Sequence, residues 1–480
     1  MNYLILINGA GGHRPFYARV GEELRARGHK VVYALDSHYT DYLYPDAVLV
    51  PPMEYFSDYL ERHFEAPPVV RPDLLALNVW TAFFPDLDRF MTSGGAYRRI
   101  PDYYPRVLRC LLAFFDELIS KEAIDFVVYE NVSNSFVYTC FLVAQNRGAG
   151  YVGFVMSRLP GRADVVDGKF VRDSWTKEAY HDVLQGRVDV PAEVRAQVDH
   201  YLATFDAQLP DYLVKNPVHQ GVLERYGARA PLRTFVRSMR YLIGSHHQYL
   251  FSYQLGNPAW VFPEQFVREV IRSPKLAWVR RRYYRDALPE GPFFVYPIQF
   301  HPESATSVDG PHFVDEWNNV RNVAINMPFG VQLVVKDHKN AAAMQPLWFY
   351  ENVSKLPNVT LLDCNADARA MLRKSAAVVT VTSTMGYEAV VLGKPVFLLG
   401  NPFYDFHPLC MKIRSFDDAF DAFSGYREMK ASHEEIRALV TAYFMTSFEG
   451  PFDLGVQYAD MALVKRVADQ ILGRAARRST

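Results

Sequence analysis

The sequence predicts an α/β protein with two blocks, each of which alternates strands with helices. Short apolar runs that end at glycine or polar residues recur in residues 1–220 and again in residues 291–430. Such alternation is typical of parallel sheets that carry helices. A chain of 480 residues is also long enough for two or three domains. We therefore expect two sheets in two separate units.

The first block opens with a strand, a tight turn and a helix. Residues 3–8 are apolar, residues 9–12 are rich in glycine, and residues 15–27 have the spacing of an amphipathic helix. The pattern continues with strands at 30–35, 124–129 and 150–156 and helices at 107–120 and 134–145.

The second block repeats this alternation after a stretch of helical patterns. Its expected strands are 292–299, 331–336, 359–362, 377–381 and 395–399, and its expected helices are 312–327, 366–374 and 384–392. Residues 458–477 have the pattern of a final amphipathic helix.

Charge is balanced over the whole chain but not along it. The chain has 52 Lys and Arg and 53 Asp and Glu, so it offers no overall electrostatic reason to bind nucleic acid. Residues 221–290 nevertheless hold twelve Lys and Arg against five Asp and Glu, together with many aromatic side chains. Cations beside aromatic rings suit an anionic membrane surface or an anionic glycan. A solvated helix face with ordinary core aromatics explains the same composition.

Several classes of protein are disfavoured. The four cysteines have no CxxC spacing, which favours a reducing cytoplasm and argues against a cysteine zinc site. No apolar stretch reaches the roughly 18 residues of a spanning helix, and the apolar start of the chain is interpreted as a strand. Asp86 and Asp88 form a DxD pattern that follows no strand, so we expect no metal site and no cofactor.

Two candidate bases follow strands of the first block. His13 ends the glycine-rich turn that begins at Asn8, and Glu130 follows the apolar run 124–129. Either side chain would lie at the carboxyl edge of the sheet, where a base can deprotonate a sugar hydroxyl. Either can instead pack or cap a helix. Arg14 stands where a dinucleotide fingerprint needs glycine, although Asp36 after the next strand keeps a nicotinamide site open as an alternative.

Polar residues also follow three strands of the second block. The most specific group is a hydroxyl cluster that includes Ser383 and Thr384 and leads directly into a helix, whose free N–H groups suit a phosphate. Glu388, one turn further, is placed to bind ribose hydroxyls. The remaining candidates are Gln299, His301 and Glu303 after one strand, and Lys336 and His338, for phosphate, after the next.

The runs YPIQFHPESATS, VVKDH and VTVTSTMGYEAVVLGKPVFLLGNPFY resemble the bacterial capsular polysaccharide biosynthesis family, which includes β-Kdo transferases. The resemblance covers about residues 290–410. It implies a GT-B glycosyltransferase, in which two Rossmann-like domains face each other across a cleft and the C-terminal domain holds the nucleotide sugar. In the Kdo-transferring members the donor is CMP-Kdo and no divalent metal is required.

The resemblance also implies roles for residues. Gln299 and Glu303 correspond to the family's QxxxE pattern, and His338 corresponds to a histidine that contacts the nucleotide phosphate. Ser383, Thr384 and Glu388 fall in the phosphate and ribose loop, and His13 is loosely similar to an acceptor-side glycine-histidine loop. Lys339 replaces the family's proline, which leaves a different CMP-linked or UDP-linked donor open.

We therefore expect an inverting, metal-independent glycosyltransferase of the cytoplasm that extends a glycan or lipid-linked glycan of the bacterial surface. The alternatives are a CDP-polyol phosphotransferase and a non-catalytic capsule-assembly or export protein. The expected organisation is an acceptor-side domain, a basic linker that contacts the inner membrane, a nucleotide-sugar domain and helices that cross back, at residues 1–220, 221–290, 291–440 and 441–480.

Overall fold

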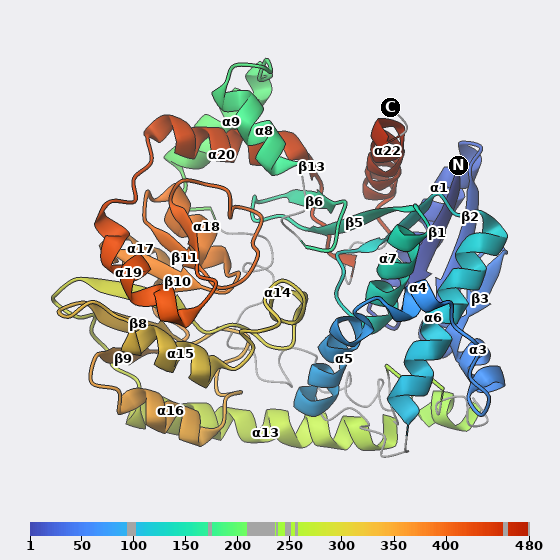
Figure 1. Ribbon diagram of the computed structural model, residues 1–480, viewed down its shortest axis with the longest axis horizontal. Helices are drawn as coiled ribbons and strands as arrows, with labels where there is room; N and C mark the ends of the chain where they lie inside the picture. Colours follow the sequence, from blue (N-terminus) through green and yellow to red (C-terminus); the bar gives the residue numbers. More distant parts are fainter. Residues whose placement is uncertain are drawn as a thin grey trace.

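Two open sheets, each with helices on both faces, form the two halves of the molecule (Figure 1). The computed structural model describes residues 1–93, 102–170, 175–208, 236, 239–244, 251–254, 258–454 and 459–478. We call the first sheet and the helices packed on it the N-terminal unit, and the second sheet with its helices the C-terminal unit.

The first sheet has the strand order β13-β6-β5-β4-β1-β2-β3. Its strands are β1 (Asn2–Ile7), β2 (Lys30–Leu35), β3 (Met53–Tyr55), β4 (Phe126–Glu130), β5 (Gly150–Met156), β6 (Arg162–Val166) and β13 (Ser447–Glu449). Strands β1 to β5 pair in parallel, and β6 and β13 are antiparallel additions at one side. The order reverses between β1 and β4.

The second sheet has the order β12-β11-β10-β7-β8-β9. Its strands, all parallel, are β7 (Phe293–Pro297), β8 (Gln332–Lys336), β9 (Val359–Leu362), β10 (Ala377–Thr380), β11 (Val396–Leu398) and β12 (Cys410–Lys412). The reversal here lies between β7 and β10. The expected pair of Rossmann-like α/β sheets is confirmed, and each of the nine expected strands is present within two residues of its expected bounds.

Helices bury an apolar core on both faces of each sheet. On the first sheet, α3 (Phe56–His63), α5 (Val79–Ser93), α6 (Tyr103–Glu122) and α7 (Ser135–Asn146) cover one face. The other face is covered by α1 (His13–Ala26) and by the last helix, α22 (Met461–Arg478). The second sheet carries α14 (Ser304–Ser307), α15 (Glu316–Ile325), α16 (Leu347–Ser354), α17 (Ala368–Lys374), α18 (Thr384–Val391) and α19 (Ala419–Ser424).

The chain passes between the units more often than the sequence suggests. Helices α8 (Thr176–Leu184) and α9 (Ala192–Ala203) lie beside α20 (His433–Thr446), above the second sheet in Figure 1. Their buried residues Tyr180 and Tyr201 share an apolar cluster with Tyr443 of α20. Residues 1–220 are therefore not one unit, because the apolar faces of α8 and α9 are buried in the C-terminal unit.

A 25-residue helix, α13 (Pro258–Arg282), runs along the lower edge of Figure 1. The helix belongs to the basic segment 221–290, much of which, including Arg225, Arg229, Arg233 and Arg237, lies outside the described residues. Two of its aromatic residues, Tyr241 and Tyr253, are buried in the N-terminal unit. None of the helices in the described ranges combines the length and the hydrophobicity needed to cross a bilayer.

Candidate functional site

The candidate residues gather at the two places where strand order reverses. In open α/β sheets, ligands bind beyond the carboxyl ends of the strands at such a reversal. The turn after β1 and the residues after β4 flank the first reversal and carry His13 and Glu130. The loops after β7 and β10 flank the second reversal and carry Gln299 and Ser383.

The structure brings the two candidate bases together. His13 Nε2 lies 2.6 Å from Glu130 Oε1, although 117 positions separate the residues. The His13 side chain is 3% exposed and the Glu130 side chain is 30% exposed. His13 Nδ1 has no hydrogen-bond partner among the described residues. Glu130 is therefore the member of the pair that can meet a substrate, and His13 lies behind it.

The backbone around this pair is fixed by close contacts. Gly12, with φ of 78°, is left-handed and begins α1, and its N–H donates to the Tyr44 hydroxyl at 2.6 Å. A Cβ atom at Gly153 on β5 would lie only 2.5 Å from the carbonyl oxygen of Glu130. Glycine at these two positions lets the turn and the strand approach closely enough to place His13 against Glu130.

Gln299 ties the two strands of the second reversal together. Its buried side-chain amide donates to the Pro297 carbonyl at 2.7 Å and to Thr380 Oγ1 at 3.4 Å. Its backbone N–H donates to Glu316 Oε1 at 2.8 Å. Burial raises the pKa of Glu316 to about 8. Gln299 thus stabilises the base of the site, and its side-chain amide makes its hydrogen bonds to protein groups in the interior.

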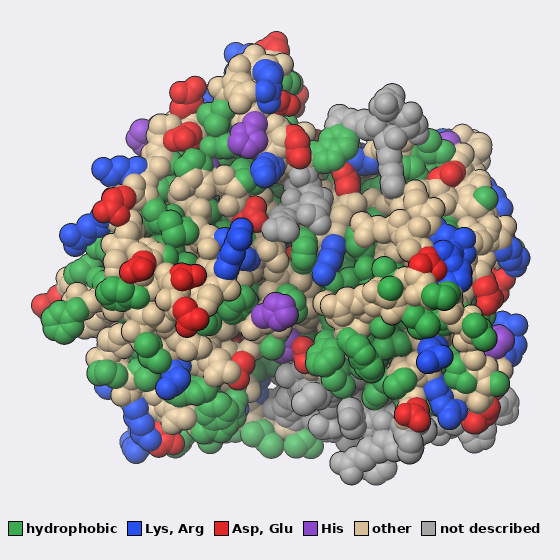
Figure 2. Space-filling view, in the orientation of Figure 1, with side chains coloured by type: hydrophobic (Ala, Val, Ile, Leu, Met, Phe, Trp, Pro, Cys, Tyr) green, Lys and Arg blue, Asp and Glu red, His purple; other side chains and the backbone are tan. Residues whose placement is uncertain are grey.

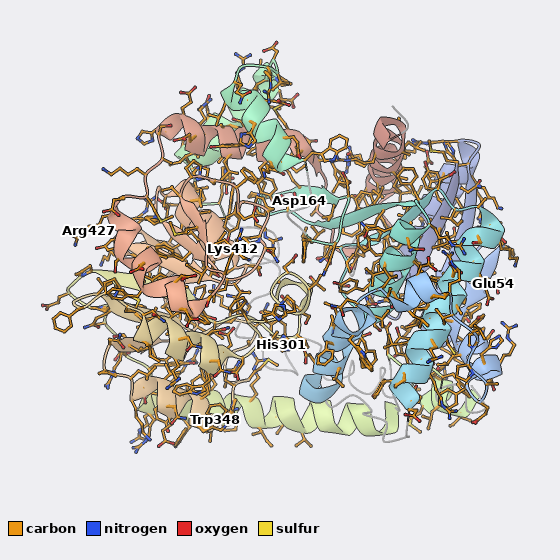
Figure 3. The ribbon with its side chains drawn as sticks, in the orientation of Figure 1. Glu54, Asp164, His301, Trp348, Lys412 and Arg427 are labelled. Carbon is orange, nitrogen blue, oxygen red and sulfur yellow. The ribbon has the colours of Figure 1, made fainter. Side chains whose placement is uncertain are left out.

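The loop after β7 also contacts the N-terminal unit. The Asn131 amide, next to Glu130, donates to Ser304 Oγ at 2.8 Å. His301 Nδ1 lies 2.8 Å from Thr306 Oγ1, and its Nε2 lies 3.4 Å from Asp88 of α5. Figure 3 places His301 between the two halves of the molecule. These contacts join the loop after β7 to Asn131 and to α5 of the N-terminal unit.

Glu303 lies in the same loop and caps helix α14. It occupies the N-cap position, and its side chain and that of Thr306 form a capping box. The Glu303 side chain is exposed.

The two aspartates of the DxD pattern take part in hydrogen bonds and ion pairs. Asp86 is buried and accepts from the Ser135 N–H and from Gln254 Nε2, each at 2.9 Å. Asp88 pairs with His301. Among the side chains that the structure describes, no three or more His, Cys, Asp or Glu are grouped to hold a metal ion.

Lys336 and His338 differ in what they can offer to a phosphate. The Lys336 ammonium is buried and donates to the carbonyls of Cys364 at 2.7 Å and Asp337 at 3.1 Å, and burial lowers its pKa to about 8. His338 Nδ1 accepts from the Asn340 N–H at 3.1 Å, so the neutral ring carries its proton on Nε2. Burial lowers the pKa of His338 to about 4. His338 is therefore a neutral donor, whereas Lys336 supports the loop.

The start of α18 presents backbone donors at the second reversal. Ser383 is the N-cap residue, and its Oγ accepts from the Met385 N–H at 3.2 Å. The Tyr404 hydroxyl donates to the Ser383 carbonyl at 2.9 Å and packs over Gly386, where a Cβ atom would lie 2.0 Å from that hydroxyl oxygen. Thr384 is the first residue of the helix. The N–H groups of the first turn and the helix dipole favour an anion here.

The Glu388 side chain is buried, whereas a contact with a ribose needs an accessible carboxylate. Its side chain is 6% exposed, and its Oε1 accepts from Arg369 Nη2 at 3.0 Å and Nε at 3.2 Å. Burial raises the pKa of Glu388 although Arg369 acts in the opposite direction. Arg369 also lies over the Phe205 ring, with its Cζ 4.3 Å from the ring centroid. This carboxylate joins α18 to α17 and to the segment after α9.

Sequence reasoning missed the contacts that cross between the units. Asp88 was considered only as part of the DxD pattern, and Ser304 and Lys412 were given no role. The Lys412 ammonium donates to the Leu399 carbonyl at 3.0 Å and to Asn401 Oδ1 at 3.1 Å, in the segment that follows β11. Strand β12, which carries Lys412, has only three residues and gives little sequence signal.

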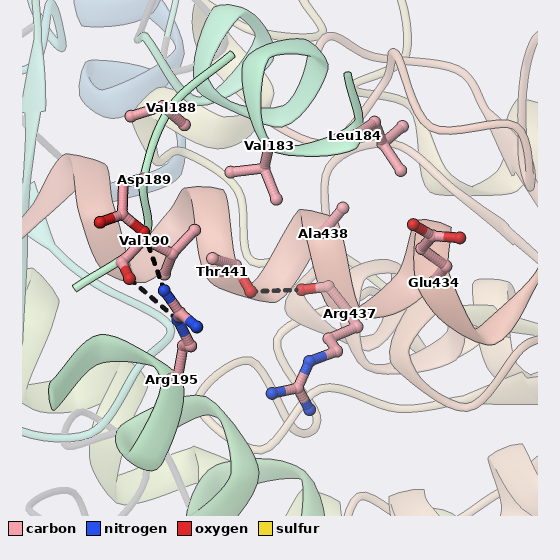
Figure 4. A pocket seen from close by; sticks show the side chains of 10 residues that line it. All are labelled: Val183, Leu184, Val188, Asp189, Val190, Arg195, Glu434, Arg437, Ala438 and Thr441. Carbon is pink, nitrogen blue, oxygen red and sulfur yellow. Dashed lines mark hydrogen bonds and ion pairs between the residues drawn. The ribbon is translucent and has the colours of Figure 1, made fainter. Parts of the chain in front are cut away.

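A separate pocket lies between α8, α9 and α20 (Figure 4). Val183, Ala438 and Thr441 contribute to its lining, and Arg195 at its edge donates to Asp189 Oδ1 at 2.8 Å. None of the candidate residues of the two reversals lines it. It therefore does not belong to the candidate site.

Comparisons with known proteins were made for the sequence and for the fold. Residues 267–447 match the family described as capsule polysaccharide biosynthesis protein. Comparison with curated protein sequences yields no match.

Three solved structures that resemble this chain are described as a β-Kdo transferase, a UDP complex and a UDP-GlcNAc 2-epimerase. The β-Kdo 2,7 transferase KpsC of Thermosulfurimonas dismutans is 12% identical over 73% of this chain and 88% of its own, with a TM-score of 0.36. The UDP complex of S. aureus MnaA is 11% identical over 98% and 95%, with a TM-score of 0.26. The UDP-GlcNAc 2-epimerase of Methanocaldococcus jannaschii is 9% identical over 97% and 100%, with a TM-score of 0.29.

The family match spans all six strands of the second sheet and the loops after β7, β8 and β10 that carry the phosphate candidates. Residues 267–447 of this chain are thus similar to the family of capsule polysaccharide biosynthesis proteins.

Proposed function

We propose that this protein is an inverting glycosyltransferase of surface polysaccharide synthesis that works in the cytoplasm without a metal ion. The donor is a nucleotide sugar, with CMP-Kdo as the first candidate, and the acceptor is a glycan or lipid-linked glycan. One observation carries the proposal: the His13–Glu130 pair lies at the first reversal, a helix start suited to phosphate lies at the second, and the Asn131–Ser304 contact joins the loops of the two sheets. This combination provides a place for each of the two substrates.

In the proposed reaction, Glu130 accepts the proton of the acceptor hydroxyl. The hydroxyl oxygen then forms a bond to the anomeric carbon, and the bond between that carbon and the nucleotide phosphate oxygen breaks. His13, which is buried and 2.6 Å from Glu130, orients the carboxylate. Such a base contributes roughly a hundredfold to ten-thousandfold to the rate.

The departing phosphate takes the electron pair of the broken bond and needs donors. The N–H groups at the start of α18 and the Nε2–H of His338 are suited to this role. Metal independence is supported by the contacts of Asp86 and Asp88: Asp86 accepts a hydrogen bond from the Ser135 N–H, and Asp88 pairs with His301. A cytoplasmic location is supported by the four cysteines, all of which are free thiols.

The test of the base is Glu130→Gln, with Glu22→Gln as a matched control on an exposed position of α1. We expect Glu130→Gln to lower kcat at least a hundredfold without changing the melting temperature, because the amide cannot take the proton. Glu22→Gln leaves both quantities unchanged. An unchanged kcat in Glu130→Gln contradicts the assignment.

The donor class is tested by calorimetric titration with CMP, CDP and UDP. We expect CMP to bind at least tenfold more tightly than UDP. A preference for UDP or CDP rejects the Kdo donor, and absence of binding by all three rejects the transferase in favour of a non-catalytic role.

A further inference from the structure

Helix α13 carries an exposed apolar stripe. Val267, Val270, Ile271 and Trp278 are 54%, 55%, 55% and 45% exposed, and Pro274 between them is also exposed. The spacings from 267 to 271, 274 and 278 are those of one face of an α-helix. Figure 2 shows hydrophobic side chains along this lower edge of the molecule.

A neighbouring face of α13 holds the helix in this orientation. Arg272 donates to the carbonyls of Asn340 and Ala342 at 2.6 and 2.8 Å, and Lys275 donates to that of Gln345 at 2.6 Å. Val279 is fully buried in the core under the second sheet. Turning the stripe inward would break these contacts, so the stripe faces outward in the folded protein.

A second exposed apolar pair lies beside the helix. The Gln345 carbonyl, which accepts from Lys275, lies two residues before α16. In that helix Leu347 is 44% exposed and Trp348 is 51% exposed. Figures 1 and 3 show α16 alongside α13, with Trp348 at the same lower edge. We call Val267, Val270, Ile271, Trp278, Leu347 and Trp348 the α13 surface.

Positive charge stands at the end of this surface. Arg281 and Arg282 are exposed in the last turn of α13, and Arg285 is exposed just beyond it. The described acidic side chains nearby are Asp363, which pairs with Arg280 at 2.5 Å, Glu351, which pairs with Lys355 at 2.7 Å, and the exposed Asp286 and Glu290. Among the side chains that the structure describes, Arg281, Arg282 and Arg285 thus give the end of the stripe a positive charge.

We propose that the α13 surface docks the protein on an anionic lipid bilayer. A straight, outward-facing helix that exposes branched aliphatic side chains and tryptophan beside arginine has the composition of an interfacial membrane helix. Each arginine near an anionic surface adds attraction that salt weakens. This docking is independent of the proposed transfer reaction, and it would bring a lipid-linked acceptor and the enzyme to the same surface.

Vesicle flotation tests the proposal with the full chain. We expect binding to vesicles of phosphatidylcholine with about 30% phosphatidylglycerol at low salt, and at least tenfold weaker partition to pure phosphatidylcholine vesicles or at high salt. The triple variant V267S/I271S/W278S and the double variant R281E/R282E each lower the partition at least tenfold.

Two controls match these variants elsewhere on the surface. F329S removes a fully exposed aromatic side chain, and R427E/K430E reverses two exposed positive charges near α19; both keep wild-type binding. Melting temperatures of all variants are compared with wild type, and W278S alone replaces the triple variant if that variant unfolds.

The proposal is overturned if wild type does not float with anionic vesicles, or if the folded α13 variants float as well as wild type. A wild-type dimer that becomes monomeric in V267S/I271S/W278S, without vesicle binding, would overturn it in favour of a second copy of the chain. Transfer to a soluble acceptor should be unchanged in the α13 variants. Loss of docking and loss of the proposed function are therefore distinguished.

Discussion

At the scale of single residues, the protonation of His338 determines how the proposed phosphate site works. The Asn340 N–H fixes the neutral tautomer, and burial lowers the pKa of the ring to about 4. The ring is therefore neutral between pH 6 and pH 8 and offers one N–H rather than a positive charge.

We expect His338→Ala to weaken CMP binding by roughly tenfold to a hundredfold, because a hydrogen bond to a charged group contributes roughly 1.5–3 kcal/mol. The loss should be equal at pH 6 and pH 8 in calorimetric titrations, since the ring does not titrate in that range. His433→Ala, at an exposed position of α20, serves as the control and binds CMP normally. A loss that is much larger at pH 6 than at pH 8 would show that His338 acts as a cation instead.

The same pKa shift affects folding stability with a definite sign. Folded His338 releases its proton at about pH 4 and an unfolded histidine at about pH 6.5, so the unfolded chain binds more protons between these values. The contribution of this residue to the free energy of unfolding therefore falls as the pH decreases from 6.5 to 4. It is constant above pH 6.5.

At the scale of elements, helix α18 was predicted correctly, but the main contact of its Glu388 side chain was not. The strand, the hydroxyl cluster and helix α18 agree with the sequence prediction, and Glu388 lies one turn into the helix as expected. Its partner, Arg369 on α17, could not be identified from sequence spacing because the contact depends on how two helices pack.

We expect Glu388→Ala to lower the free energy of unfolding by roughly 3–5 kcal/mol, because it leaves Arg369 as a buried charge without its carboxylate. The double variant R369A/E388A should be less destabilised than the sum of the two single variants, as measured in urea denaturation. CMP affinity measured on the fraction that remains folded should change little. A stable Glu388→Ala protein that no longer binds CMP would instead support the ribose role.

Other elements were predictable to different degrees for physical reasons. Long apolar runs such as those of β1 and β7 identify buried parallel strands, because they are covered on both faces. Strands β12 and β13 have three residues each and therefore provide too short a pattern. Helix α13 contains three prolines, which is unusual for a helix of 25 residues.

At the scale of the whole molecule, the carboxyl edges of the sheets were predictable and the pairing between distant residues was not. His13 and Glu130 were each assigned from a strand that ends in a polar residue, and the order of the strands brings them together. The His301–Asp88 contact requires the relative placement of the two units, about which local patterns contain no information. The same holds for the helices that pass from one unit to the other.

The last helix provides the most direct test of this whole-molecule arrangement. Leu463 and Val467 of α22 are fully buried in the core under the first sheet with Phe16 and Val20 of α1, although they lie at the opposite end of the chain. Truncation of a buried leucine costs roughly 2–5 kcal/mol. We therefore expect Leu463→Ala to speed amide hydrogen exchange in β1 and α1 while exchange in β10 and α18 stays as in wild type.

Met461 offers the matched control, because it lies two residues earlier on the same helix and is 47% exposed. Met461→Ala should leave exchange unchanged throughout, since substitutions at exposed positions usually change stability by less than about 0.5 kcal/mol. Faster exchange in β10 and α18 after Leu463→Ala would mean that α22 stabilises the C-terminal unit. Equal protection of α1 in both variants would mean that α22 contributes little to the first core, and that the two ends of the chain fold independently.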